Sequence, residues 1–417
     1  MERIKATYTI ETAFSLHEVA SAMAGEQSTG TFLKLKTEAD PIVQRQASLV
    51  EAVTELEDVA QASLPGSVTP KNWDGRRRCG RVTLSWPLDT IGPSLPNLMA
   101  TIAGNLFELQ QLSGIRLNDV GLPRAFLDRY PGPGFGIAGT RQLTNVETLP
   151  LIGTIIKPSV GLTPEATAAM VSRLIEAGID FIKDDELQSD GPFCPFVERV
   201  DAVMRVINQA AQRYGRKVMF AFNLTGEVDE MCRRHDIVKN AGGTCVMVSL
   251  NSVGLAGFSA FRKHSTLPIH GHRNGWGLYY RSPHLGIDYI AYQRLWRVAG
   301  VDHLHVNGIR NKFSESGESS IASARACLTP LAADDACLAM PVFSSAQWAG
   351  QAVETYQALG SADLIYACGG GIVGHPGGIA AGVESVKSAW RAALAGQTLA
   401  DRAKDSPELA AALDFFS

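Results

Sequence analysis

After residue 150, short apolar runs rich in β-branched and aromatic residues recur along the chain. Each is followed by a polar or glycine-bearing loop and a helical stretch, such as 163–177, where Ala166, Met170, Leu174 and Ala177 form one stripe. Eight such units are what a (β/α)8 barrel requires. A doubly wound open sheet is the alternative, but it gives no reason for every strand to end in polar residues. The predicted strands are 153–157, 181–185, 218–223, 245–250, 267–272, 303–306, 338–343 and 364–368.

The first part of the chain has a different pattern, typical of an α+β unit. The Pro-Gly-Pro-Gly run at 131–134 is typical of a linker between two domains. We therefore predict an α+β N-terminal domain over 1–130 and an α/β barrel domain over 131–417. In the N-terminal part we predict strands at 5–10, 30–36 and 82–86, and helices at 14–23 and 42–49.

Composition narrows the class of protein. The chain has 417 residues, of which 45% are hydrophobic and 19% charged, as in an ordinary globular enzyme. A net charge of -4 gives no sign of a nucleic-acid partner. No apolar run reaches the length of about 20 residues that spans a bilayer, and the N-terminus alternates like a strand rather than a signal peptide. Seven cysteines without a CxxC motif indicate reduced thiols, so we predict a cytoplasmic protein.

The second predicted strand ends in four consecutive charged residues, in the segment GIDFIKDDE at 178–186. Unpaired charges inside a core are costly, so this strand must open into a polar pocket. Alternation places Lys183 and Asp185 on one face, and Glu186 follows where the strand gives way to a loop. The two carboxylates can bind a hard divalent cation, and Lys183 adds a third oxygen ligand if its amine captures carbon dioxide as a carbamate. The alternative is an ion-paired strand end.

A (β/α)8 barrel places its functional groups directly after the strands. Seven of the eight predicted strands end in chemically useful groups, which is difficult to explain as chance. We therefore expect a site at this end of the barrel. The groups are Lys157 on the first strand, Lys183 to Glu186 on the second, Asn223 on the third, His270, His272 and Arg273 on the fifth, His303 and His305 on the sixth, Ser344 and Ser345 on the seventh, and Gly369, Gly370 and Gly371 on the eighth.

Several of these groups allow two interpretations. The glycine run at 369–371 can present backbone N–H groups to an anion or form a flexible loop. Arg273 can clamp a phosphate or serve as an ordinary salt-bridge partner. Lys312 is either a surface lysine or the cation of a closing lid. The histidines of strands five and six share a face within each pair, so each pair lines the barrel mouth or packs outward.

Five motifs, in order and at suitable intervals, resemble the large chain of ribulose-bisphosphate carboxylase (RuBisCO). They are GTIIKP at 153–158, GIDFIKDDE at 178–186, HGHR at 270–273, HLH at 303–305 and GGGIVGHPGG at 369–378. EQSTGT at 26–31 and Gly-Asn at 104–105 resemble that family's N-terminal motifs. The resemblance implies a ferredoxin-like α+β domain followed by a (β/α)8 TIM barrel. It also implies a homodimer, or a ring of dimers, with active sites shared between subunits.

The resemblance further implies roles for individual residues. Lys183 would carry the carbamate and bind Mg2+ together with Asp185 and Glu186. Lys157 would be an acid/base lysine, and Lys312 a lid lysine that faces a carboxylate. The remaining implied residues are His272 and His305 along the substrate, Arg273, Ser344, Gly369, Gly370 and Gly371 for phosphate or other substrate oxygens, and Glu26 and Asn105 from the partner subunit.

Four departures separate the chain from carbon-fixing carboxylases. Ser159 replaces the last lysine of their KPK motif, and Trp276 replaces a histidine after HxHR. Ser345 and Ala346 stand where carboxylases carry two glycines, and the loop around Lys312 is not of the GxVxGKLEG type. Because the predicted metal ligands are all present, we interpret the chain as an active RuBisCO-like protein that does not fix carbon.

The retained groups are suited to binding a sugar phosphate on magnesium and stabilising an enediolate. Lys312 favours loss of carbon dioxide, since a cation beside a carboxylate is useful when that group leaves. We therefore predict a carboxy-lyase that decarboxylates a 3-oxo-aldonate phosphate, such as 3-oxo-isoapionate 4-phosphate in apiose catabolism. The alternatives are the related transcarboxylase/hydrolase, an enolase or isomerase of methylthio-sugar phosphates, and a non-catalytic sugar-phosphate sensor.

Overall fold

The computed structural model of the protein describes residues 2–30, 40–332 and 337–417, which form two compact units. The first unit comprises Met1–Pro131 and Gly275–Val298, and the second comprises Gly132–Asn274 and Ala299–Ser417. The units are therefore not two consecutive stretches of sequence. The predicted domain boundaries, 1–130 and 131–417, stay a prediction.

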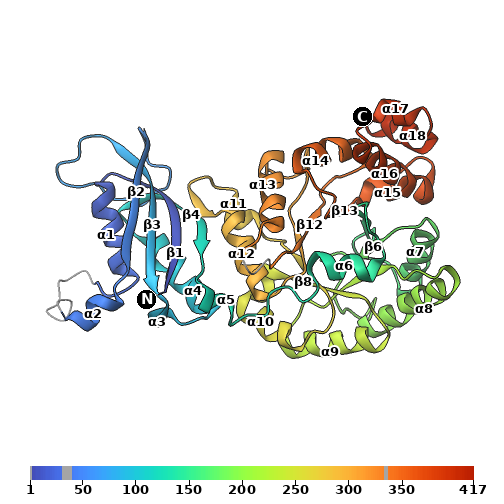
Figure 1. Cartoon of the computed structure of the whole chain (residues 1–417), viewed down its shortest axis with the longest axis horizontal. Helices are drawn as coiled ribbons and strands as arrows, with labels where there is room; N and C mark the ends of the chain where they lie inside the picture. Colours follow the sequence, from blue (N-terminus) through green and yellow to red (C-terminus); the bar gives the residue numbers. More distant parts are fainter. Residues whose placement is uncertain (1, 31–39, 333–336) are drawn as a thin grey trace. The chain divides into compact units, whose positions relative to one another are not determined.

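The second unit contains a closed barrel of eight parallel strands (Figure 1) in the order β11-β12-β13-β5-β6-β7-β8-β9. The barrel closes where β13 pairs with β5, with Ile365 opposite Leu151. This closure confirms the predicted (β/α)8 fold and excludes the open sheet. The predicted strands differ from the observed ones by one or two residues at their ends. The strands are β5 Leu151–Ile155, β6 Phe181–Lys183, β7 Met219–Asn223, β8 Cys245–Ser249, β9 Ile269–His272, β11 His303–His305, β12 Met340–Phe343 and β13 Ile365–Ala367.

Helices follow the barrel strands as predicted, but the buried face of one was predicted only in part. α7 (Pro164–Glu176) begins at Thr163, whose side chain accepts a hydrogen bond from the backbone N–H of Ala166. Leu174 of the predicted stripe is buried, but Ala166 is exposed and Met170 and Ala177 are half-buried. Val171 and Ile175 share the buried face with Leu174, because these larger side chains bury more apolar area. The other helices of this unit are α6 Gly136–Thr144, α8 Phe196–Tyr214, α9 Val228–Asn240, α10 Leu250–His264, α13 Gly317–Leu328, η3 Ala349–Gln351, α14 Ala352–Leu359, α15 Gly369–Val373, α16 Gly378–Leu394, α17 Leu399–Ala403 and α18 Pro407–Phe416.

The first unit is built on a five-stranded sheet in the order β10-β4-β1-β3-β2, which confirms the predicted α+β class. The predicted helix at 42–49 ends earlier, at Gln46, because Leu49 begins an edge strand of mixed apolar and charged residues that are mostly exposed. The predicted strand at 30–36 lies almost wholly outside the described residues. The strands are β1 Arg3–Thr12, β2 Leu49–Val59, β3 Arg77–Pro87, β4 Leu112–Gly121 and β10 Leu285–Ile287; the helices are α1 Leu16–Glu26, α2 Pro41–Gln46, α3 Leu88–Ile91, α4 Leu95–Ile102, η2 Asn105–Glu108, α5 Arg124–Leu127, α11 Gly277–Tyr280 and α12 Tyr289–Ala299.

The interior of the barrel is packed with side chains from successive strands. A core cluster contains Leu151, Phe181, Met219, Met247 and Val342, all fully or almost fully buried. The interior is therefore a solid core, and ligands must bind at its end. No helix in the described part of the chain is long and apolar enough to cross a membrane.

One histidine inside this core makes stability depend on pH. Burial lowers the pKa of His303 to about 3, whereas a histidine in an unfolded chain has a pKa near 6.5. As the pH falls below about 6.5, the unfolded state binds a proton that the folded state does not. We therefore expect this group to lower the free energy of unfolding by up to about 1.4 kcal/mol per pH unit, until the pH reaches about 3.

Urea unfolding between about pH 7 and pH 5 checks this expectation. The variant His303→Asn should lose less stability over this range than the wild type, even if it is less stable at pH 7. His17→Asn, at an exposed position on α1, is the matched control and should behave like the wild type. Identical pH dependence in the wild type and His303→Asn would contradict the prediction.

Candidate active site

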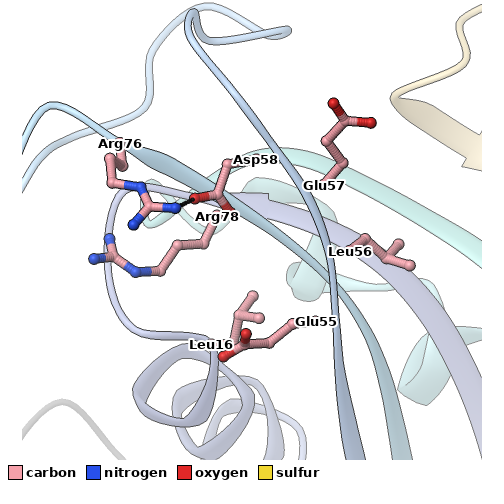
Figure 2. Close-up of a pocket in the computed structure, with 7 residues that line it drawn as sticks. All are labelled: Leu16, Glu55, Leu56, Glu57, Asp58, Arg76 and Arg78. Carbon is pink, nitrogen blue, oxygen red and sulfur yellow. Dashed lines mark ion pairs between the residues drawn. The ribbon is translucent and has the colours of Figure 1, made fainter.

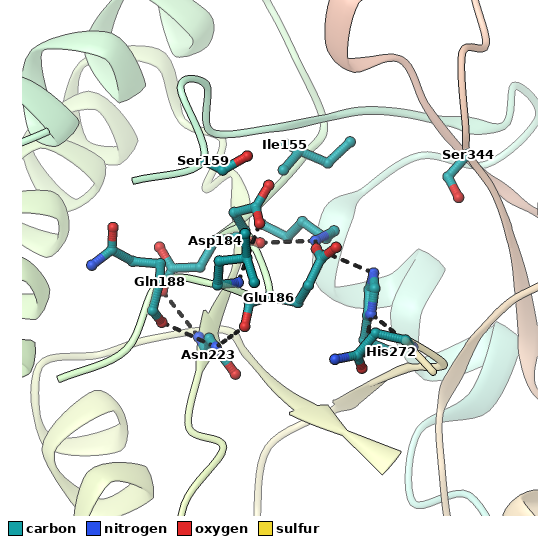
Figure 3. Close-up of polar contacts among 12 residues, drawn as sticks. Ile155, Ser159, Asp184, Glu186, Gln188, Asn223, His272 and Ser344 are labelled. Carbon is teal, nitrogen blue, oxygen red and sulfur yellow. Dashed lines mark hydrogen bonds and ion pairs between the residues drawn. The ribbon is translucent and has the colours of Figure 1, made fainter. Parts of the chain in front are cut away.

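The charged end of β6 forms the centre of the candidate site (Figure 3). The Lys183 side chain is only 1% exposed, and its Nζ lies 3.4 Å from Glu186 Oε2. Lys183 Nζ also donates a hydrogen bond of 2.9 Å to the backbone carbonyl of Asp184. From β9, His272 Nε2 approaches the same Glu186 oxygen at 3.3 Å. The structure thus brings two of the predicted magnesium ligands together with a predicted substrate residue.

A second set of contacts joins this centre to β5 and to the end of β13. Lys157 Nζ donates hydrogen bonds of 2.6 Å to Asp185 Oδ2 and 2.8 Å to Ser159 Oγ. A Cβ placed on Gly369 would lie 3.9 Å from Lys157 Cε, so the glycine run begins beside this lysine. Lys157, Asp185 and Gly369 therefore meet at one end of the barrel.

Burial controls the protonation of this cluster. It lowers the pKa of Lys183, although Glu186 and Asp185 oppose the shift. Burial raises the pKa of Asp185, but hydrogen bonds from Lys157 and Ser159 outweigh it and keep the pKa below its usual value. Burial and then the charge of Lys183 lower the pKa of His272 to about 4. At neutral pH the site thus combines a neutral imidazole with an ionised Asp185.

The donor atoms of this cluster fit a magnesium ion. Asp185 is almost fully buried and Glu186 is 29% exposed, so one carboxylate is enclosed and the other is open to a ligand. Hard divalent cations prefer oxygen ligands, which an unmodified lysine does not supply. A carbamate on Lys183 would complete an all-oxygen set with Asp185 and Glu186. Burial favours the neutral amine of Lys183, which is the form that reacts with carbon dioxide.

Buried polar groups hold the loop that carries Glu186. Asp184 points away from Lys183 and lies 3.4 Å from Arg199 Nε on α8, and both side chains are 1% exposed. The Asn223 side chain donates hydrogen bonds to the backbone carbonyls of Glu186, at 3.2 Å, and Gln188, at 3.0 Å (Figure 3). Arg199 was not predicted as a site residue, and Asp184 was predicted only as part of the charged run that ends β6. The two-residue alternation of the strand, which turns Asp184 away from the barrel, was the available signal.

The histidines of β9 and β11 point into the barrel, which resolves the choice that their spacing left open. His270 Nε2 lies 2.7 Å from His305 Nε2, and His305 Nδ1 lies 3.1 Å from Ser344 Oγ in the loop after β12. The rings of His305 and His272 are 4.4 Å apart. Burial lowers the pKa of both His270 and His305 well below the usual value. His305 and Ser344 thus connect to the centre through His272.

Two predicted cations, Arg273 and Lys312, have no described contact with the cluster around Lys183. Arg273 is buried and paired with the carboxylate of Glu315, which was not among the predicted site residues. Lys312 is exposed, and its Nζ lies 5.3 Å from the ring of Phe313. Among the contacts of the described residues, none joins Lys312 to the Lys183 cluster. Its closure over the site stays a prediction.

The remaining predicted residues have local contacts of their own. A Cβ on Gly371 would lie 2.5 Å from the carbonyl oxygen of Gln347, so close packing alone requires a glycine there. In the first unit, Asn105 Nδ2 donates to Glu26 Oε1 at 3.5 Å, which places these two residues side by side. Their contribution to the partner subunit's site stays a prediction.

A second group of possible metal ligands is poorly suited to that role. His235 Nδ1 and His264 Nε2 lie 2.9 Å and 2.8 Å from Asp236 Oδ1. However, the backbone N–H of Thr266 donates to His235 Nε2 at 3.1 Å. His235 Nδ1 must then carry the proton of the neutral ring and donates to Asp236, so it has no lone pair for a metal.

The first unit contains an open cavity of about 460 Å³ between β2, β3 and the start of α1 (Figure 2). Both of its arginines are ion-paired, since Arg76 lies 2.5 Å from Asp58 and Arg78 contacts Asp74. None of the predicted site residues lines it. We interpret it as a surface hollow between ion pairs rather than as the active site.

The closed barrel, with lysines and carboxylates gathered at one end of its strands, defines a (β/α)8-barrel enzyme. Comparison with known protein families supports this class. The model of the ribulose bisphosphate carboxylase large chain, catalytic domain, matches residues 136–416, and that of its N-terminal domain matches residues 2–126. The chain belongs to the RuBisCO large-chain family.

Three members of this family are similar to the chain over its whole length. A 3-oxo-isoapionate-4-phosphate transcarboxylase/hydrolase of Xanthobacter autotrophicus is 58% identical over 415 residues, covering 100% of this chain and 99% of the relative. A 3-oxo-isoapionate-4-phosphate decarboxylase of Rhizobium rhizogenes is 46% identical over 416 residues, covering 99% and 98%. A rubisco-like protein from Burkholderia fungorum, known from its crystal structure, aligns with a TM-score of 0.94 at 45% identity, covering 100% of both chains.

Proposed function

We propose that the protein removes the carboxyl group of a 3-oxo acid sugar phosphate, such as 3-oxo-isoapionate 4-phosphate, as carbon dioxide. The observation that carries the proposal is the contact of Lys157 with Asp185, beside Lys183 and Glu186. It places a proton donor next to the groups that would hold the substrate oxygens. Similarity over the whole chain to relatives named for this substrate supports the choice of substrate.

In the proposed reaction the bond between the carboxyl carbon and its neighbour breaks, and the electron pair moves onto the 3-oxo group to give an enediolate. Lys183, as its carbamate, Asp185 and Glu186 would hold Mg2+. When bound, this ion supplies positive charge that stabilises negative charge on substrate oxygens. Lys157 then donates a proton to the enediolate carbon. Lys312 faces the departing carboxylate, and the glycine run at 369–371 binds the phosphate through its backbone N–H groups.

A second function, transcarboxylation coupled to hydrolysis, is favoured by the 58% identity to a relative of that name. Both functions begin with loss of the same carboxyl group. Substrate labelled with carbon-13 at this carboxyl separates them by NMR. Label released as carbon dioxide and bicarbonate supports the decarboxylase, and label kept in an organic product supports the transcarboxylase/hydrolase. If the enzyme leaves this substrate intact but tautomerises a methylthio-ketose phosphate, both proposals are wrong.

The proposed assembly is a cytoplasmic homodimer, or a ring of dimers, with shared active sites. In this arrangement Glu26 and Asn105 act in the partner subunit's site. Their hydrogen-bonding contact within the first unit supports a common role, since both side chains present polar atoms from one patch.

We expect the protein not to fix carbon dioxide onto ribulose 1,5-bisphosphate. Ser159 contacts Lys157 where carboxylases carry a further lysine, and a hydroxyl cannot replace that positive charge. With labelled bicarbonate and magnesium, phosphoglycerate should contain no label above an enzyme-free control, while an authentic carboxylase assayed in parallel should give a clear signal. Label in phosphoglycerate above that background would show the prediction to be wrong.

A further inference from the structure

The side chain of Gln347 joins two loops at the carboxyl end of the barrel. Gln347 lies in the loop after β12 (residues 344–348, the β12 loop) and is only 1% exposed. Its Nε2 donates hydrogen bonds to the backbone carbonyls of Ile309, at 3.1 Å, and Ser345, at 3.2 Å. Ile309 belongs to the loop between β11 and α13 (residues 306–316, the β11 loop). One buried amide group therefore bridges the β11 loop and the β12 loop.

The oxygen of the same amide faces β13. The hydroxyl of Tyr366 donates to Gln347 Oε1 at 3.4 Å and to the backbone carbonyl of Trp348 at 3.0 Å. Reversal of the amide would turn its oxygen toward the carbonyls of Ile309 and Ser345, and two acceptors cannot form a hydrogen bond. The partners of Gln347 thus fix its orientation, and they come from three adjacent strands of the barrel or the loops that follow them.

Packing supports the same contact from the side of the β11 loop. A Cβ placed on Gly308 would lie 2.3 Å from Gln347 Cδ, so a glycine is needed for the loop to approach the amide this closely. Asn311 Nδ2 donates to the backbone carbonyl of Gly308 at 2.8 Å and to that of Glu315 at 2.9 Å. The turn held by Gln347 is therefore tied to the segment that carries Lys312.

The amide of Gln347 is the buried anchor next to Lys312 in this loop. Lys312 is exposed and lies three residues after Ile309. Arg310 also contacts a neighbouring element, since it pairs with Glu354 on α14 at 2.5 Å. Both of these side chains are more than half exposed, and such a surface ion pair contributes little. The buried hydrogen bond from Gln347 is therefore the stronger restraint on this part of the loop.

We propose that Gln347 is a positioning residue, whose amide anchors the β11 loop at Ile309 and thereby sets the position of Lys312 during the reaction. This inference rests on the proposed function, in which Lys312 faces the departing carboxylate. It goes beyond that function by naming the residue through which the β12 loop and Lys312 act together. Gln347 acts through the backbone of the β11 loop rather than on the reacting atoms.

Limited digestion with trypsin, without substrate, tests the anchor. Arg310 and Lys312 are cleavage sites in the β11 loop, and mass spectrometry of the early peptides identifies cuts at these two positions. Gln347→Met keeps the length of the side chain but cannot donate to the carbonyl of Ile309. We expect it to raise the initial rate of both cuts about tenfold, the scale of one or two lost hydrogen bonds. Cleavage reports this change because it follows the population of the opened loop.

Two further variants show whether the bridge causes the change. Gln351→Met removes another buried amide, 2% exposed, which donates to the carbonyl of Ala346 and accepts from the backbone N–H of Trp348. These contacts do not involve the β11 loop, so its cleavage should stay at the wild-type rate. Gly308→Ala keeps Gln347 but pushes its amide away, and should raise cleavage as Gln347→Met does.

Kinetics with a 3-oxo acid sugar phosphate test the link to Lys312. Gln347→Met should lower kcat for carbon dioxide release about tenfold with little change in KM, because the proposed contact of Lys312 acts in cleavage rather than in binding. In a Lys312→Met background, the same substitution should lower kcat by less than about twofold. A residue with only a structural role would lower kcat by the same factor in both backgrounds.

Wild-type cleavage rates in folded Gln347→Met would overturn the anchor, and equal losses of kcat in the two backgrounds would overturn the positioning role. If circular dichroism shows that Gln347→Met does not fold, Gly308→Ala decides both tests. Digestion needs no substrate, so its result is separate from the proposed function. Faster cleavage in an enzyme that releases no carbon dioxide would support the anchor and contradict the proposed function.

Discussion

Lys183→Met is expected to abolish turnover, lowering kcat/KM for a 3-oxo acid sugar phosphate by about 1,000-fold or more. Methionine has a similar length and is apolar, so it fits the buried space of Lys183, whose side chain is 1% exposed. It cannot form a carbamate, and the proposed magnesium site would lose one of its three protein ligands. The fold should remain, since the core cluster of the barrel does not include Lys183.

Two measurements check this result. Carbon dioxide release gives kcat/KM, and NMR with carbon-13 bicarbonate should show a carbamate signal in the wild type but not in Lys183→Met. Lys217→Met, which removes a lysine that donates to the backbone carbonyl of Gly242, is the control and should retain both activity and signal. A folded Lys183→Met enzyme with wild-type turnover would refute the proposed ligand set.

Lys312→Met is expected to slow carbon dioxide release about 100-fold, comparable with the loss of one charged contact in a transition state. Lys157→Met should act on a later step. Without its ammonium group, proton delivery to the enediolate slows, and cleavage then competes with its own reversal. The two lysines occupy different settings, since Lys157 contacts Asp185 and Lys312 is exposed on its loop.

Following carbon dioxide release and solvent-deuterium uptake in both variants separates these steps. Lys312→Met should lower both signals together, because cleavage precedes protonation. Lys157→Met should lower deuterium uptake more than the initial release of carbon dioxide. Lys239→Met, at an exposed position on α9, should behave as the wild type. Unchanged carbon dioxide release in Lys312→Met would remove the lid lysine from the mechanism.

Local pattern determined much of the fold. All eight barrel strands were predicted from their apolar runs, because a buried parallel strand carries a nearly continuous apolar signal within a few residues. The same argument placed charged groups at the strand ends, and the structure brings Lys157, Lys183, Asp185 and Glu186 together there. Edge strand β2 was not predicted, because it is mostly exposed and mixes apolar with charged residues, so no continuous apolar run marks it.

The sequence by itself determined the barrel, its strand order along the chain and the charged residues at its carboxyl end, since each depends on neighbours in sequence. Only the tertiary structure decided which of these groups meet. Glu315 neutralises Arg273 from 42 residues away, and Asp184 pairs with Arg199 on a packed helix. Such pairs depend on distances between side chains of different strands and loops. Those distances are set when β13 pairs with β5 and closes the barrel. The spacing of apolar and polar residues along the sequence does not predict them.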